Sequence, residues 1–147
     1  MREVIAVDPD TVRSGVAVWK DNKIEIFNLS FPELLDFLQE RTGAKVIVEA
    51  GWLNKKSNFH GAKGGIGQKI ANGVGRNAEV GRKIIEMCEH YGIDVREQRP
   101  LKKGWKNGKI SHEEISKFIP GFPKRSNPET RDAALLLWVE LGKPIKL

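Results

Sequence analysis

Short apolar runs separated by polar turns predict a sheet that starts at the N-terminus. Residues 4–7 form an apolar, β-branched run typical of a strand buried on both faces. Residues 15–19 and 23–28 predict two more strands, joined by a turn at Asp21-Asn22. Together these three strands predict an antiparallel meander.

Helical spacing and capping residues predict helices in the rest of the chain. Ser30, Ser111 and Asn127 each stand where a helix N-cap is expected, and residues 77–91 carry apolar positions at helical spacing. The predicted helices cover residues 32–41, 77–91, 111–118 and 127–141, and strands over residues 45–48 and 93–97 lie between them.

Residues 51–76 are rich in glycine and basic side chains, which predicts a mobile loop. The glycine spacing of a phosphate-binding P-loop is absent. The whole order of elements predicts one domain over residues 1–147, of the α/β class, with a mixed sheet covered by helices.

Several features place the chain among cytoplasmic proteins without a membrane span. The apolar run over residues 133–139 is too short to cross a bilayer. The first residues lack the pattern of a signal peptide, and the single cysteine, Cys88, excludes an internal disulfide framework.

The positive charge is concentrated in the second half of the chain. The formal net charge is +6, and residues 1–65 hold nine basic and nine acidic side chains. The excess therefore lies in residues 66–147, and residues 96–109 alone contain six bases and one acid. A one-sided basic surface suits a polyanion such as nucleic acid, although a solvated loop would have the same composition.

Acidic residues stand where the predicted elements end or begin. Asp8 closes the first strand and Glu49 the fourth, while Glu129 and Asp132 lie three apart on one face of the last helix. Clustered carboxylates repel each other unless a cation joins them, and magnesium prefers such oxygen ligands. Taken singly, Asp8 could be a turn former and Glu129 an acid favoured by the helix dipole.

The joint pattern resembles that of RuvC-like Holliday junction resolvases. Ile-Ala-Val-Asp-Pro at residues 5–9, with Ser-Gly-Val-Ala-Val at 14–18, resembles their first motif. Residues 46–49 resemble the second motif, and residues 129–134 the last. The order and spacing cover nearly the whole chain.

The resemblance implies an RNase H-like fold: a mixed five-stranded sheet, with three antiparallel strands followed by parallel ones, flanked by helices. It implies a homodimer that cuts four-way DNA junctions with Mg²⁺ or Mn²⁺, two ions per site. The implied catalytic metal ligands are Asp8, Glu49, Glu129 and Asp132.

The resemblance also implies contacts with DNA. Trp52, three positions after Glu49, would stack on bases, or else anchor its loop to the core. Lys102 and Lys103 would touch the scissile phosphate. The further phosphate contacts expected are Lys55, Lys56, Arg76, Lys106 and Lys109.

One departure from the family pattern is Asp10, where the family usually has glycine. Aspartate tolerates unusual turns, and it could add a carboxylate to the site. Other functions remain open at this stage: an RNase H-like nuclease acting on RNA or an RNA/DNA hybrid, or a catalytically silent nucleic-acid-binding protein. An actin-like nucleotide-binding protein would need a longer chain.

Overall fold

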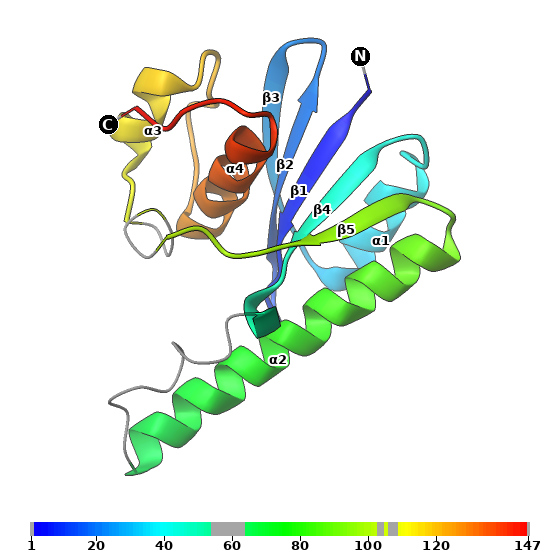
Figure 1. Ribbon diagram of the computed structural model, residues 1–147, viewed down its shortest axis with the longest axis vertical. Helices are drawn as coiled ribbons and strands as arrows, with labels where there is room; N and C mark the ends of the chain where they lie inside the picture. Colours follow the sequence, from blue (N-terminus) through cyan, green and yellow to red (C-terminus); the bar gives the residue numbers. More distant parts are fainter. Residues whose placement is uncertain (1, 54–63, 103–104, 106–108, 147) are drawn as a thin grey trace.

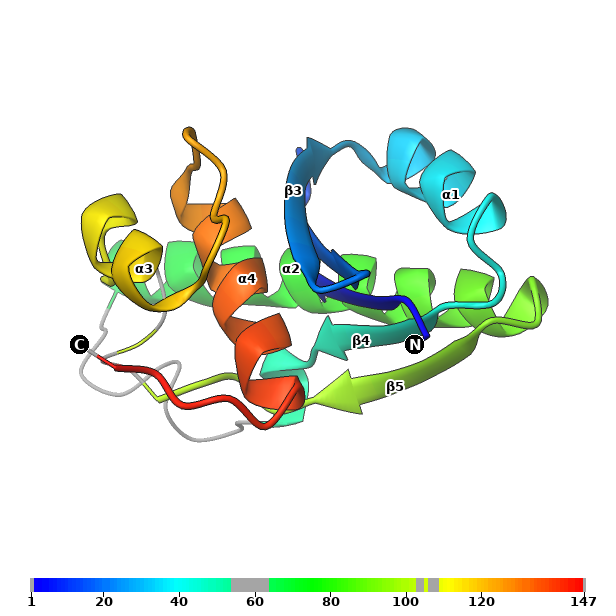
Figure 2. The ribbon, with the colours of Figure 1, turned by 90° about the horizontal axis from the view of Figure 1, so that it is seen from above.

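A computed structural model gives the fold and describes residues 2–53, 64–102, 105 and 109–146, with the backbone alone over residues 64–74. Within these residues, five strands form a sheet in the order β3-β2-β1-β4-β5, with α1 and α2 on one face and α4 on the other (Figures 1 and 2). The strands are β1 (Val4–Asp8), β2 (Ser14–Lys20), β3 (Lys23–Leu29), β4 (Lys45–Glu49) and β5 (Asp94–Gln98); the helices are α1 (Phe31–Gln39), the 3-10 helix η1 (Gly51–Leu53), α2 (Gly64–His90), α3 (His112–Phe118) and α4 (Pro128–Glu140).

The strand directions confirm the predicted fold class. β1 pairs antiparallel with β2, and β2 with β3, whereas β4 and β5 add in parallel. Between β2 and β3 the chain turns through Asp21 and Asn22, whose φ angles are 52° and 60°. Positive φ at both positions is typical of a type I′ turn, which suits a two-residue hairpin.

Alternate residues of β1 face two different apolar layers. Ala6 faces the layer that includes α3 and α4, whereas Ile5 and Val7 face the layer that includes α1 and α2. Successive side chains of a strand point to opposite faces of its sheet, so a strand with both faces covered is apolar throughout. The uninterrupted apolar run of β1 follows from this position.

α4 is packed on the sheet along its length and held by charge at its C-terminal end. Its residues 133–138 are all buried. The Glu140 carboxylate accepts a hydrogen bond from Lys45 Nζ at 2.8 Å and also pairs with Arg96. Burial raises the pKa of Glu140, but the two cations outweigh burial and hold the pKa below its usual value. Because Lys45 lies on β4 and Arg96 on β5, these pairs fasten α4 to the parallel strands.

The prediction of a loop over residues 51–76 is wrong for its second part, where α2 begins at Gly64 rather than near Asn77. The sequence carries a signal for this helix, since Ile66, Ile70 and Val74 recur every four residues. A glycine costs a helix about 1 kcal/mol relative to alanine. Extending a helix that is already formed needs no new nucleus, so these glycines are tolerated. Residues 51–53 form η1, and residues 54–63 lie outside the described residues.

The length of α2 alone would suffice to span a bilayer, since it has 27 residues. It carries charged side chains, however, such as Arg82 and Glu86. No helix in the described part of the chain combines the length and apolar character that a membrane crossing requires.

Candidate active site

Two acids lie side by side at the C-terminal ends of two neighbouring strands. β1 and β4 are parallel, with Val7 opposite Val48, so the next residue of each strand is an acid at the same edge. These acids are Asp8 and Glu49, and their side chains are hydrogen-bonded to each other. The structure thus brings together two residues that lie far apart in the sequence.

The first turn of α4 adds two more acids. The Asn127 side chain accepts a hydrogen bond from the Thr130 backbone N–H at 2.8 Å, and the Asn127 N–H donates to Thr130 Oγ1 at 2.9 Å. This cap starts the helix at Pro128, so that Glu129 and Asp132 follow in its first turns. Both acids act electrostatically on Asp8. We call the four residues the acid cluster: Asp8, Glu49, Glu129 and Asp132.

A glycine allows α4 to lie this close to the sheet. Gly15 is the residue paired with Asp8 across the β1–β2 ladder. A Cβ atom at Gly15 would lie 2.1 Å from the carbonyl oxygen of Glu129 and 2.9 Å from the Thr130 nitrogen. These are backbone atoms, which cannot rotate away as a side chain can. The missing side chain of Gly15 is therefore what lets α4 approach Asp8.

The acid cluster opens onto a cavity of about 300 Å³ between β1, α2 and α4. Carboxylates line much of it, and none of the lining residues that the structure describes is basic. Glu49 is not part of the lining and acts on Asp8 through its negative charge and, to a lesser extent, through the hydrogen bond between the two side chains. The lining residues are Asp8, Pro9, Asp10, Asn77, Pro128, Glu129 and Asp132.

The environment of Asp8 disfavours its charged form. Burial raises its pKa well above the ordinary value, and the negative charges of Glu49, Asp132 and Glu129 raise it further, as does the hydrogen bond to Glu49. An acid with neighbours of the same sign is stabilised by a proton or by a metal cation. Positive charge close to Asp8, from a proton or from a metal cation, would therefore stabilise the site.

The donors of this cluster are of the kind that a divalent cation prefers. Among the described residues, no group of three or more His, Cys, Asp or Glu side chains is placed so that it could hold a metal ion as it stands. Magnesium keeps several waters and can bind through only one or two carboxylates. The donors offered are hard carboxylate oxygens, and a cation would relieve the repulsion around Asp8.

Asp10 stabilises the turn that follows β1. Its Oδ2 accepts hydrogen bonds from the backbone N–H groups of Val12, at 3.0 Å, and Arg13, at 3.4 Å. Its φ angle is not positive, so the turn does not require glycine at this position. Asp10 also lines the cavity. Asp10, at the position where the sequence resemblance suggests glycine, thus keeps the turn and adds a carboxylate beside the acid cluster.

Trp52 is folded onto α2 beside the acid cluster. Its Nε1–H donates to Glu97 Oε2 at 3.1 Å, and the guanidinium of Arg82 lies 5.1 Å from its ring centroid. A Cβ atom at Gly81 would lie 2.7 Å from the Trp52 ring and 3.2 Å from Pro9, so the absence of a side chain at Gly81 makes room for the indole. The indole is half-buried, with part of its surface open to solvent.

The expected phosphate-binding residues are only partly described. Arg76, Lys102 and Lys109 are exposed, and none of them lines the acidic cavity. The ammonium of Lys102 lies 5.3 Å from the centroid of the Trp105 ring. Four of the predicted residues lie outside the described residues: Lys55, Lys56, Lys103 and Lys106.

Two residues at the site were not predicted. Asn77 was placed at the start of a helix but lies within α2, where it lines the cavity; no signal in the sequence marks its role. The role of Gly15 was partly predictable, because a glycine inside a strand often marks the close approach of another backbone. The glycine alone does not indicate which helix or strand approaches.

Comparisons with known proteins support the fold. No protein-family model and no curated protein matches the sequence. The chain is similar to a solved structure of T. thermophilus RuvC in complex with a Holliday junction substrate, with 17% identity, a TM-score of 0.57 and 100% of both chains covered. A second Thermus thermophilus RuvC structure has 17% identity, 99% coverage of both chains and a TM-score of 0.47; YeaZ from Pseudomonas aeruginosa has 10% identity, full coverage of both chains and a TM-score of 0.46. The similarity to the junction-bound structure shows that the chain has a RuvC-like fold.

The approach of α4 can be tested by adding one methyl group at Gly15. We expect Gly15→Ala to lower the free energy of unfolding by about 2 kcal/mol or more, because the new Cβ meets backbone atoms of α4. Urea unfolding measures the change. Gly43→Ala is the control, since a Cβ there has nothing within 4 Å and should alter stability little. Equal effects of the two substitutions would refute the proposed role of Gly15.

The electrostatic cost at Asp8 can be tested in metal-free buffer. Because the pKa of Asp8 is raised in the folded state, the cost is absent at low pH and grows as the pH rises through that pKa. We expect Asp8→Asn to raise the Tm at neutral pH and to flatten its decline between acidic and neutral pH. Asp36→Asn, which removes an exposed carboxylate from α1, is the control. A lower Tm for Asp8→Asn would contradict the repulsion.

Proposed function

We propose that this chain is a divalent-metal-dependent endonuclease that cuts four-way DNA junctions. One observation carries the proposal. Acids from β1 and α4 line one cavity, Glu49 at the end of β4 acts on Asp8 from beside it, and burial together with the repulsion among these acids raises the pKa of Asp8. A binding protein for phosphates gains nothing from such a cluster, because uncompensated negative charge repels its ligand. A metal-dependent nuclease needs one.

The acid cluster would hold the Mg²⁺ or Mn²⁺ ions. When bound, such ions supply an activated water and stabilise the leaving oxygen of a phosphodiester. The protein itself contributes rigid positions: Asp8 and Glu49 are placed by paired strands, and Asp132 by a capped helix packed on Gly15. Asp10 is less available, because one of its oxygens already caps the β1–β2 turn.

Branched DNA is the proposed substrate. Three features support it: exposed basic side chains, the Trp52 indole and the fold. Exposed basic side chains on α2 and in the segment after β5 can neutralise phosphates of a bound DNA. Trp52, next to Pro9, offers part of its ring for stacking. The fold is that of a protein whose solved structure contains a Holliday junction. The basic residues are Arg76 on α2 and, after β5, Lys102 and Lys109; Lys103 and Lys106 belong to the same stretch of sequence after β5.

A homodimer follows from the same proposal, because a four-way junction offers two symmetric cutting positions. α2 extends well past the edge of the sheet at its N-terminal end (Figure 1), and we propose that a second copy contacts this part of the helix. Paired nicks in opposite strands of one junction would report two sites acting together.

The acid cluster can be tested by replacing single carboxylates with amides. We expect Asp8→Asn, Glu49→Gln and Asp132→Asn each to reduce cleavage by about 10³-fold or more while junction binding is retained, since a charged metal ligand is lost without a change of shape. The assay compares a four-way junction, matched duplex DNA and an RNA/DNA hybrid, each with and without Mg²⁺.

The controls and contrary outcomes are specific. Asp36→Asn should cleave as the unaltered chain does, because Asp36 is exposed on α1. Full activity in any one amide variant would remove that residue from the site. Preferred cleavage of the hybrid would replace the DNA-junction proposal by an RNA-directed nuclease, and cleavage without metal would refute the metal-dependent mechanism.

The stacking role of Trp52 can be separated from its packing role. We expect Trp52→Leu, which keeps an apolar side chain on Gly81, to slow junction cleavage more than it weakens duplex binding, since stacking contributes about 1–3 kcal/mol per base. Gel-shift and single-turnover assays measure the two effects, and the Tm monitors packing. Equal losses in both assays, together with a lower Tm, would leave Trp52 as an anchor only.

A further inference from the structure

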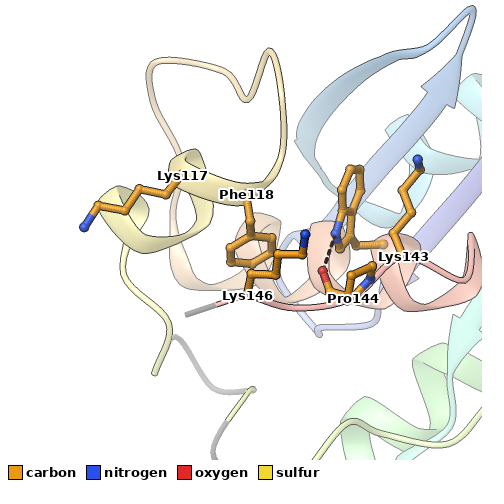
Figure 3. A pocket seen from close by; sticks show the side chains of 6 residues that line it. Lys117, Phe118, Lys143, Pro144 and Lys146 are labelled. Carbon is orange, nitrogen blue, oxygen red and sulfur yellow. Dashed lines mark hydrogen bonds between the residues drawn. The ribbon is translucent and has the colours of Figure 1, made fainter.

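A second cavity lies at the other end of α4, away from the acid cluster. It encloses about 320 Å³ between the end of α3, the end of α4 and the C-terminal segment (Figure 3). The Trp138 Nε1–H donates to the carbonyl oxygen of Pro144 at 3.0 Å, which holds the C-terminal segment across α4. The lining residues are Lys117, Phe118, Trp138, Lys143, Pro144 and Lys146, and we call this site the basic aromatic cavity.

The lining combines positive charge with aromatic surface. Its three lysines are exposed, and within the described part of the chain no acid lines the cavity. The ammonium of Lys143 lies 5.1 Å from the Trp138 ring centroid, and Lys146 and Phe118 line the same cavity (Figure 3). Phe118 is half-buried, so part of its ring is open to the cavity. The chain therefore presents cations beside an accessible ring at a site outside the acid cluster.

We propose that the basic aromatic cavity binds a single-stranded segment of DNA, with phosphates beside the lysines and one base or sugar against Phe118. This inference rests on the proposed function, which supplies the identity of the polyanion. Proteins that bind single strands combine a positive groove with aromatic side chains, and this lining has both. The cavity is at the small end of the range for ligand sites, about 300–1,000 Å³, so it suits one nucleotide-sized group rather than a duplex.

An acidic protein segment is the competing ligand, and the aromatic surface argues against it. Glutamate and aspartate side chains gain from the lysines alone, whereas a nucleotide gains from the lysines and from Phe118. The position also favours DNA. Glu129 and Trp138 are nine residues apart on α4, about 13 Å along the helix axis, so a strand held here would stay within reach of the proposed cutting site.

Lysine acetylation followed by mass spectrometry tests this inference directly, using the full chain in metal-free buffer. The probes are an oligo-dT strand, a duplex with the same number of phosphates and polyglutamate of the same charge. We expect oligo-dT to slow acetylation of Lys117, Lys143 and Lys146 more than either other probe does. Lys20 and Lys23 on the β2–β3 hairpin are the references, because they are exposed and line no part of the cavity.

A paired variant tests the phosphate contacts by salt dependence. Lys117→Gln with Lys146→Gln should reduce the slope of log Kd against log salt for oligo-dT by about 0.7 per lost contact. Lys20→Gln with Lys23→Gln should leave that slope unchanged. Phe118→Leu should weaken oligo-dT binding about five-fold or more while the Tm stays near that of the unaltered chain.

The contrary outcomes are distinct from failure of the proposed function. Equal protection by polyglutamate would overturn the inference in favour of an acidic protein partner, and equal protection by duplex would overturn the single-strand assignment. Protection of Lys102 and Lys109 without protection of Lys117, Lys143 and Lys146 would also overturn it, while the proposed function would stand. The junction cleavage assay tests the proposed function separately.

Discussion

The contact between two backbones at Gly15 determines where α4 can lie, and the position of α4 determines whether the acids meet. Strand pairing alone brings only Asp8 and Glu49 together. Glu129 and Asp132 join them because the first turn of α4 rests directly on β2, with no side chain between. A site assembled from distant segments thus depends on one position where a side chain is absent.

Holding four carboxylates together opposes folding, and the rest of the structure supplies the compensation. Apolar layers cover both faces of β1, and α4 is buried along residues 133–138. At the far end of the helix, Glu140 pairs with Lys45 and Arg96. Electrostatic strain at one end of α4 is therefore balanced by packing along it and by favourable charge at the other end.

The sequence predicted the sheet well because its strands carry local signals: apolar runs, a hairpin turn and acids at strand ends. It also placed Asp8 and Glu49 at strand ends, where they would meet if the two strands were neighbours, and the sheet order fulfils that condition. It did not predict the start of α2, where glycine composition masked the spacing of Ile66, Ile70 and Val74. Nor could it predict the close approach at Gly15 or the packing of Trp52 on Gly81, which depend on contacts between distant segments.

The clamping of α4 at both ends has a consequence for any long ligand. The first turn of the helix packs directly on the backbone at Gly15, and its last turn is held by the ion pairs of Glu140. The helix therefore cannot readily tilt or slide. α4 has 13 residues and is therefore about 20 Å long. If a DNA strand binds in the basic aromatic cavity at one end of α4, the distance from that binding site to the acid cluster would be fixed by the length of the helix rather than by the base sequence.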